Sequence, residues 1–478
     1  MAAAEHRAER DTTPLAQAAA DREDWPATYA LLHGRPLGPD GLALLSDAAW
    51  WSGRIDESVS ARLRAHAAYV AAGDPRGAGL TAWWLADAYR RLGRPAAAAG
   101  WLHRAHHDLD GRPDCPEQGL LAWTDTADAE EHHDPAAALA AVRRATRLAV
   151  RSGSPDLLAL ARQAEASLLL AHDRRTEAFA LLDAAMGAAT AGALGSTVTG
   201  RLFSLAPGQA LRAGDLRRAA AWSQAAMTWC AGPPSGPAPG PHPFRPLCRV
   251  HHLQVLDLRG AWAQAEEAVR LVWQEAGPDT LGAAADASYT LGEIRRRQGR
   301  TAEAQRSYAR AYGLGRVPQP GLALLRLAQG RPDAALAGLR LALDCQTDPA
   351  HDRLGRARLL AALTETTLVL GAHGAAAGAV TELEALAAPD APLLAAPAAG
   401  ARGALTGDPA PLRRALALWL DLDVPYEAAR VRLLLAAADR ANGDETAARH
   451  ELRAARAAFE RLGATPNAAR AARRLATS

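Results

Sequence analysis

Gly299-Arg-Thr-Ala-Glu-Ala304, followed by Tyr308 and Ala311, decides the fold, because its pattern recurs along the whole chain. The pattern is a glycine, an alanine five residues later, a large apolar residue at nine and a small residue at twelve. Anchor positions are about 31 to 46 residues apart, a period typical of helical repeat arrays. The other ten anchors are Gly53, Gly93, His133, Asp173, Gly214, Gly260, Gly330, Gly371, Gly407 and Gly443.

Each anchor predicts the turn between two antiparallel helices. Glycine readily adopts the left-handed backbone conformation that ends a helix and reverses the chain. The small residue five positions later lets the second helix approach the first, and the residues at nine and twelve continue its buried stripe. Because one hairpin cannot bury both of its faces, neighbouring hairpins must stack. Eleven anchors and a degenerate first hairpin over residues 15–33 therefore predict an all-α solenoid of about twelve hairpins.

The chain divides at one proline-rich segment. Residues 232–246 read Gly-Pro-Pro-Ser-Gly-Pro-Ala-Pro-Gly-Pro-His-Pro-Phe-Arg-Pro, which predicts an extended loop. It is either a hinge between two half-solenoids, residues 15–231 and 247–478, or a surface insertion. Residues 1–14 are expected to be a disordered tail. A second Ala/Pro/Gly-rich stretch, residues 389–403, predicts a loosened helix.

Composition excludes several function classes. All 54 basic residues are arginine, so a Walker A lysine, a Schiff-base lysine and a Ser-Lys dyad are excluded. The net charge of +2 is spread along the chain, whereas nucleic-acid binders concentrate basic charge. The four cysteines form no CxxC pair, which favours a reducing cytoplasm. No signal peptide or membrane-length apolar run is recognisable in the sequence, so we expect a cytoplasmic protein with no membrane contact.

The repeat resembles the tetratricopeptide (TPR) motif at Leu291-Gly292, Gly299, Ala304, Tyr308 and Ala311. More closely, the chain over residues 15–476 resembles the helical-repeat region of large actinobacterial LuxR-type transcriptional regulators. The stretches that carry this resemblance include Ala48-Ala-Trp-Trp-Ser-Gly53, Leu291-Gly-Glu-Ile-Arg-Arg-Arg-Gln-Gly-Arg300 and Pro425-Tyr-Glu-Ala-Ala-Arg430.

The resemblance implies a right-handed superhelix with a concave groove. Such regulators continue into a helix-turn-helix domain of roughly 60 residues, whereas this chain stops at Ser478. Either the chain is a piece of a longer regulator, or it is a stand-alone solenoid that has kept the sensing part, and no direct nucleic-acid binding is expected of it.

In TPR arrays the first helix of each hairpin lines the groove, so the resemblance implies a set of groove residues. A groove with indole faces and mixed charges suits a peptide, a protein segment or a flat small molecule. Tryptophan at helical spacing is otherwise core packing. No cofactor or metal is expected, and homodimer formation is left open. The groove candidates are Asp47, Trp50, Trp83, Asp87, Arg90, Trp123, Glu130, Gln163, Gln254, Asp286, Tyr289, Glu293, Arg296, Arg430 and Arg440.

A second hypothesis is a solenoid enzyme that acts on a small molecule in secondary-metabolite biosynthesis. His103 and His107 share one face of an expected helix, and Glu130, His132 and His133 end the next one. Brought together, these side chains could bind a metal or transfer protons. The alternative interpretation is that they are solvated or capping histidines, since their spacing is not that of an HExxH motif.

Overall fold

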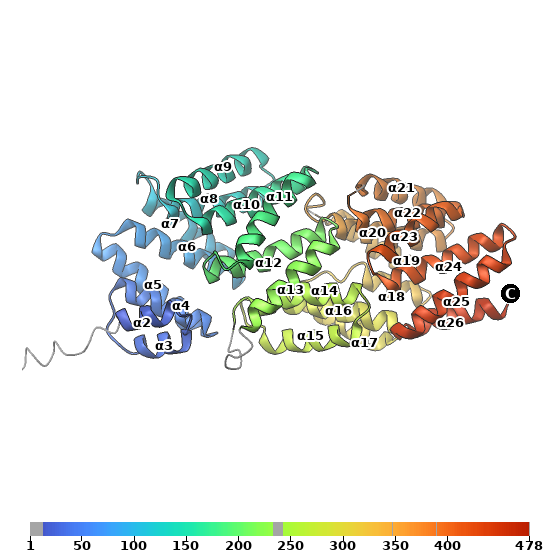
Figure 1. Ribbon diagram of the computed structural model, residues 1–478, viewed down its shortest axis with the longest axis horizontal. Helices are drawn as coiled ribbons and strands as arrows, with labels where there is room; N and C mark the ends of the chain where they lie inside the picture. Colours follow the sequence, from blue (N-terminus) through green and yellow to red (C-terminus); the bar gives the residue numbers. More distant parts are fainter. Residues whose placement is uncertain (1–12, 233–241, 347, 389, 478) are drawn as a thin grey trace, which may run out of the picture.

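The computed structural model describes residues 13–232, 242–346, 348–388 and 390–477, which form 25 α-helices and no strand (Figure 1). Consecutive helices pack as twelve antiparallel hairpins, and α26 covers the last one. The helices are α2 (Thr13–Ala20), α3 (Trp25–Leu32), α4 (Pro39–Trp51), α5 (Ile55–Ala72), α6 (Pro75–Arg91), α7 (Pro95–Leu109), α8 (Pro116–Glu131), α9 (Pro135–Ser152), α10 (Pro155–Ala171), α11 (Arg175–Thr190), α12 (Ser196–Arg212), α13 (Leu216–Ala231), α14 (Arg245–Leu258), α15 (Trp262–Glu275), α16 (Leu281–Gln298), α17 (Thr301–Gly313), α18 (Gly321–Ala328), α19 (Pro332–Asp344), α20 (Arg353–Val369), α21 (His373–Leu386), α22 (Pro392–Thr406), α23 (Pro409–Asp421), α24 (Pro425–Ala441), α25 (Glu445–Leu462) and α26 (Thr465–Ala476).

The predicted TPR-like α-solenoid of about twelve hairpins is confirmed by this arrangement. All eleven anchors adopt the left-handed conformation, with φ from +56° at His133 to +89° at Gly214. His133 and Asp173 (φ +60°) do so without glycine's freedom, as the spacing alone predicts. The alanines five residues after the anchors are buried, as at Ala304 and Ala448. The register of the repeat is therefore set by local turn geometry and by close helix packing.

The segment boundaries differ in detail from the sequence predictions. Residues 1–12 and 233–241 lie outside the described residues, and so do 347, 389 and 478. Helix α2 begins at Thr13, and α14 begins at Arg245, so the ends of the expected tail and loop are helical. Proline is tolerated in the first helical turn, because a backbone N–H at that position would have no acceptor within the helix. A loosened helix is predicted for residues 389–403, and within that stretch α22 is helical from Pro392 onward. It contains Pro397, which cannot donate the usual backbone hydrogen bond of a helix interior.

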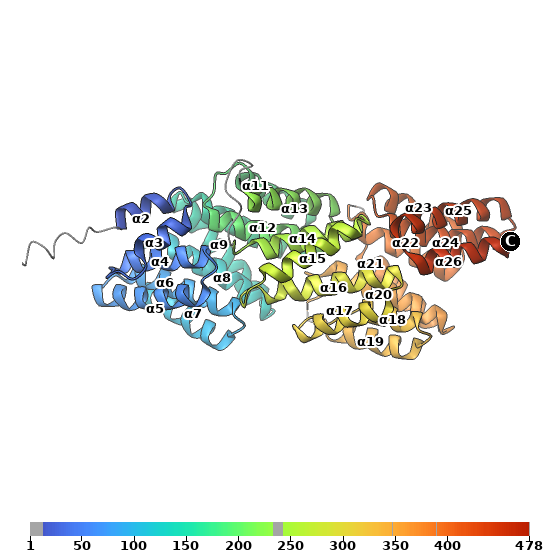
Figure 2. The same cartoon turned by 90° about the horizontal axis from the view of Figure 1, so that it is seen from below.

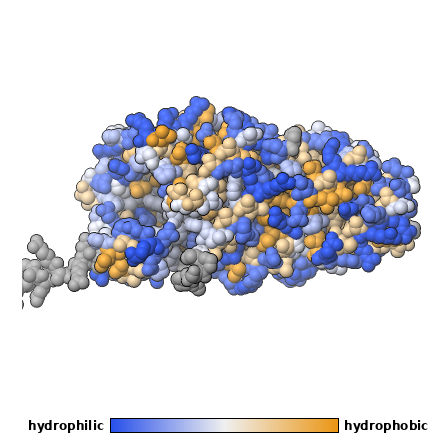
Figure 3. Space-filling view, in the orientation of Figure 1, coloured by the Kyte–Doolittle hydropathy of each residue, from blue (hydrophilic) through white to orange (hydrophobic). Residues whose placement is uncertain are grey.

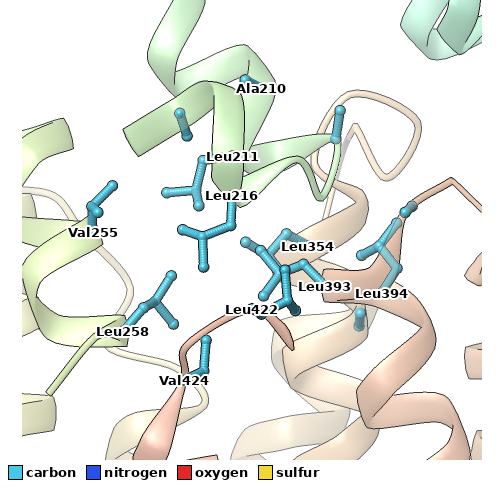
Figure 4. Packing of buried hydrophobic residues seen from close by; sticks show 14 of the residues in the cluster. Ala210, Leu211, Leu216, Val255, Leu258, Leu354, Leu393, Leu394, Leu422 and Val424 are labelled. Carbon is cyan, nitrogen blue, oxygen red and sulfur yellow. The ribbon is translucent and has the colours of Figure 1, made fainter. Parts of the chain in front are cut away.

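Segments far apart in the sequence form the central core. Apolar side chains of α12, α13 and α14 pack against α20, α22 and the turn between α23 and α24, as Figure 4 shows. Leu211 and Leu258 thus share one cluster with Leu354, Leu393 and Val424. The two views in Figures 1 and 2 place α2–α5 at one end of an elongated molecule and α24–α26 at the other. Helices α12–α14 lie in the middle and join the two halves.

Figure 3 shows one face of the molecule, coloured by hydropathy. On the face seen in Figure 3, hydrophobic residues lie in separate patches between hydrophilic ones. Within the described part of the chain, no helix is long and apolar enough to span a bilayer.

Alanine substitutions at two glycine anchors distinguish backbone strain in the turn from a steric clash between distant hairpins. At Gly93 (φ +66°) an added Cβ would meet nothing within 4 Å, whereas at Gly260 (φ +73°) it would lie 2.3 Å from Leu462 Cδ2. We expect Gly93→Ala to lower the free energy of unfolding by about 1 kcal/mol, through backbone strain alone. Gly260→Ala should lose about 1–3 kcal/mol more, because the last hairpin must shift. Denaturant unfolding measures both, and equal losses would show that the last hairpin does not pack on Gly260.

Candidate functional site

The concave face of the first hairpins is filled by side chains from later helices. Arg201 of α12 forms a bidentate ion pair with Asp87 of α6, with Nη1–Oδ1 and Nη2–Oδ2 distances of 3.0 and 2.7 Å, although 114 residues separate them. Arg91 also donates to Asp87 Oδ2, at 2.9 Å. Burial by itself would raise the pKa of Asp87, but the two guanidinium groups hold that pKa well below its usual range. Asp87 is therefore a permanent anion bound by its own chain.

The indole rings around this ion pair are also contacted by side chains from later parts of the chain. The guanidinium of Arg201 lies 5.3, 5.4 and 5.6 Å from the ring centroids of Trp83, Trp84 and Trp123, within cation–π range. The ring of Phe244, which precedes α14, meets Trp50 edge to face at 5.3 Å. Two cavities beside these residues have volumes of about 40 and 50 Å³, room for a few water molecules but not for a peptide.

The other groove candidates of the first half also have partners within the chain. Trp123 donates to Gln163 at 3.4 Å, and Trp83 is buried. Asp47 pairs with Arg62, and Arg90 lies 3.2 Å from Asp128. Contacts within the chain thus cover the part of the groove where the sequence predicts ligand binding.

The candidate catalytic histidines do not converge. His103 and His107 line one cavity, whereas Glu130 and His133 line another. The Nδ1 of His132 lies 2.6 Å from the backbone oxygen of Asp128. Among residues 13–232, 242–346, 348–388 and 390–477, no group of three or more His, Cys, Asp or Glu side chains is placed to hold a metal ion. The geometry that the enzyme hypothesis requires is therefore not formed by these residues.

The second half contains a cavity of about 150 Å³, which we call the C-terminal cavity. It lies among α14, α16, α18, α20, α22, α23 and α24. Asp286 lies just outside its wall and pairs with the lining residue Arg316, whereas Arg440 is remote and pairs with Glu445 at 2.9 Å. Five groove candidates line the cavity: Gln254, Tyr289, Glu293, Arg296 and Arg430.

Ion pairs fix most of the charges in the C-terminal cavity. Glu293 accepts from Arg296 at 2.8 Å, from Arg297 at 3.2 Å and from Tyr308 at 2.5 Å. Burial favours the neutral acid, but the two arginines outweigh it and lower the pKa of Glu293 to about 2. Arg297 also donates to Asp257 at 2.7 Å. These groups hold one another in place and need no ligand to be satisfied.

A separate pair of carboxylates holds Arg430. It donates to Glu365 at 2.6 Å and to Glu427 at 2.9 Å, which joins α24 to α20 across the cavity.

Arg358 of α20 is the exception in this cavity. It is exposed, it lines the cavity, and no hydrogen bond or ion pair forms between it and the rest of the described chain. Arg358 is not among the groove residues expected from the sequence, although its position carries a signal. Arg358 and Glu365 precede the anchor Gly371 by the same distances at which Asp286 and Glu293 precede Gly299. The apolar wall opposite these charges consists of Leu258, Leu324, Leu354, Leu393 and Trp419.

A third space, which we call the inter-turn cavity, has a volume of about 710 Å³. It lies between α8, α10 and α12 on one side and the segment that leads into α20 on the other. His351 crosses it: Nε2 lies 2.9 Å from Glu130 Oε1, and Nδ1 lies 2.8 Å from Asp348 Oδ1. The hydrogen bond that His351 donates to Glu130, together with the one to Asp348, raises the pKa of His351 to about 9. A protonated imidazole therefore joins residues 221 positions apart.

Comparison with known proteins leaves the family open. No protein-family model matches the chain, and no curated protein matches it. Similar solved structures include a chain of the APC/C hetero-tetramer Cut9-Hcn1, with a TM-score of 0.47, 14% identity, and coverage of 95% of this chain and 88% of that one. The human IFIT1 dimer with m7Gppp-AAAA has a TM-score of 0.44 and 13% identity over 94% of each chain. The human IFIT1 dimer with PPP-AAAA has a TM-score of 0.42 and 13% identity, over 90% of this chain and 93% of that one. Likeness at this level adds nothing to what the helices themselves show.

The His351 bridge makes stability depend on pH. The pKa of His351 rises from 6.5 to about 9 on folding, so the bridge stabilises the protein fully below the unfolded pKa and is lost as pH rises through about 9. We expect His351→Ala to cost on the order of 3 kcal/mol at pH 6 and little above pH 9.5. The free energy of unfolding of wild type and variant is measured between pH 6 and pH 9.5. The difference between the two proteins isolates His351, because all other titrating groups are common to both. A difference that grows with pH would contradict the assignment.

Proposed function

We propose that the chain is a binding protein, and that its C-terminal cavity recognises an anionic group joined to an apolar part of side-chain size. The observation that carries this proposal is Arg358, a guanidinium without a partner among the described residues at a cavity whose other charges are paired. Guanidinium binds carboxylate or phosphate through short, charge-assisted hydrogen bonds.

The shape of the cavity supports one kind of ligand over larger ones. A volume of about 150 Å³ accommodates a benzene-sized group. Leu258, Leu354 and Trp419 offer such a group an apolar contact surface, and Arg358 lies where an attached anion can reach it. We therefore infer a ligand that ends in a large apolar residue with a free carboxylate. The C-terminus of a peptide and a free organic acid share this chemistry.

The paired charges give the cavity its rigidity. Arg296, Arg297 and Glu293 lie on one helix, so their network holds one wall of the cavity, and Arg430 braces α24 against α20. A site held in its bound geometry before the ligand arrives loses less entropy on binding. The cost of burying these charges is then offset within the protein, and the ligand needs only to neutralise Arg358.

The biological setting forms part of the same proposal. A relation to LuxR-type regulators would make this cavity the sensing site of a cytoplasmic regulatory protein. Pairing of two chains would fit such a role. The catalytic alternative draws no support from the separated histidines.

Short peptides test the proposal directly. We expect an acetylated tetrapeptide that ends in leucine or phenylalanine to bind with a free carboxylate and to bind about ten-fold more weakly as the C-terminal amide. Arg358→Gln should remove this preference, because it removes the charge-assisted contact. Arg306→Gln, at an exposed arginine of α17 outside the cavity, is the matched control. Isothermal titration calorimetry measures the affinities, with benzoate as the organic-acid arm. Equal affinity for acid and amide, or an unchanged preference in Arg358→Gln, would refute the proposal.

A further inference from the structure

We propose that the outer face of α9 is a docking surface for a partner protein, and that it binds an acidic segment that also carries apolar side chains. Figure 1 places α9 at the upper edge of the molecule, where its inner side packs on α8 and α10. The surface, which we call the α9 face, consists of Leu139, Arg143, Arg147 and Val150. It contributes nothing to the C-terminal cavity and does not depend on the function proposed for that cavity.

The hairpin formed by α8 and α9 separates charge between its two helices. Helix α8 contains five acidic residues and no arginine, whereas α9 contains four arginines and no acidic residue. Four of the acids of α8 bond to side chains of other segments. Of the four arginines of α9, only Arg151 forms an ion pair within the described chain, with Asp114. Because Arg143, Arg144 and Arg147 are exposed, α9 presents positive charge that the protein itself does not neutralise.

Two apolar side chains lie among these arginines. Leu139 is 41% exposed and Val150 is 66% exposed. Positions 139, 143, 147 and 150 are three or four residues apart, so their side chains share one side of the helix over a length of about 16 Å. The other side of α9 is buried against its neighbours and supplies the core contacts. The α9 face therefore combines cations with aliphatic groups that folding does not use.

A cavity of about 480 Å³ extends this positive surface toward α7. Arg144, the neighbour of Arg143 in sequence, lies in its wall. Asp110 and Asp114 also line the cavity, and Arg151 already neutralises Asp114. Acidic side chains at the edge of a docked segment can therefore find further basic partners here. The basic residues that line the cavity are His103, His107, Arg112 and Arg144.

The apolar residues distinguish a protein from other anionic partners. A nucleic-acid backbone would neutralise the arginines but would gain nothing from Leu139 and Val150. Adsorption to an anionic bilayer requires an apolar helix face that enters the headgroup region, whereas that face of α9 is buried in the protein. A segment with carboxylates and aliphatic side chains uses both kinds of group. Contact along about three helical turns belongs to the small, transient class of interfaces.

A model peptide tests the proposal with the full chain. The probe is a fluorescent helical peptide of about 15 residues with glutamate and leucine along one face. A second peptide has glutamine in place of every glutamate. Fluorescence anisotropy measures both affinities at low and at physiological salt. We expect micromolar binding of the glutamate peptide that weakens with salt, and binding of the glutamine peptide that is about ten-fold weaker or more.

Charge reversal locates the binding surface. Arg143→Glu combined with Arg147→Glu should weaken binding of the glutamate peptide about ten-fold or more. The matched control is Arg449→Glu combined with Arg453→Glu on α25. These two arginines have the same spacing, and neither forms an ion pair within the described chain. The control changes the net charge by the same amount and should leave the affinity unchanged. Equal losses in the two double variants, or no binding of the glutamate peptide to wild type, would overturn the proposal.

Removal of the apolar side chains distinguishes a protein partner from a general polyanion. Leu139→Ser combined with Val150→Ser should weaken binding of the glutamate peptide several-fold and leave its salt dependence unchanged. Both side chains are exposed, so the variant should keep the unfolding midpoint of wild type. A single-stranded oligonucleotide and vesicles with phosphatidylserine serve as the other anionic probes. Tighter binding of either one than of the peptide, or an unchanged peptide affinity in this variant, would overturn the proposal.

Discussion

The ion pair between Arg201 and Asp87 is the contact on which the interpretation of this molecule depends. An array of helical hairpins needs only nearest-neighbour contacts, and its groove is then open along its length. Here α12 reaches back to α6, and Phe244 reaches back to Trp50, so later helices fill the groove of the first hairpins. Because the pair is desolvated and bidentate, its contribution exceeds that of a surface ion pair.

The same middle helices also contact the second half of the chain. Leu211 and Leu216 pack against Leu354 and Leu393, and so α12 and α13 are bounded on both sides by distant hairpins. Two spaces remain where this packing is incomplete. The inter-turn cavity lies where α8, α10 and α12 meet the segment before α20, and the C-terminal cavity lies among α14 to α24. Both cavities are therefore products of long-range packing, with ion pairs closing their walls.

Sequence reasoning captured what is encoded locally. A left-handed turn followed by a small residue leaves a pattern within twelve positions, and so all eleven anchors, including His133 and Asp173, could be placed without a structure. Groove positions counted from those anchors include five residues of the C-terminal cavity, and the same count from Gly371 would have added Arg358. The contacts of Asp87 could not be found in this way, because nothing near position 87 records where residue 201 lies. The pitch of the superhelix sums small rotations at many interfaces, and no single repeat encodes it.

A double-mutant cycle between Arg201 and Asp87 tests the self-filled groove most directly. Unfolding free energies of wild type, Arg201→Ala, Asp87→Ala and the double variant give the coupling between the two side chains. The bidentate, buried geometry predicts a coupling of about 2 kcal/mol or more. Additive effects, with a coupling below about 0.5 kcal/mol, would show that α12 does not close onto α6, and that the first hairpins present an open groove.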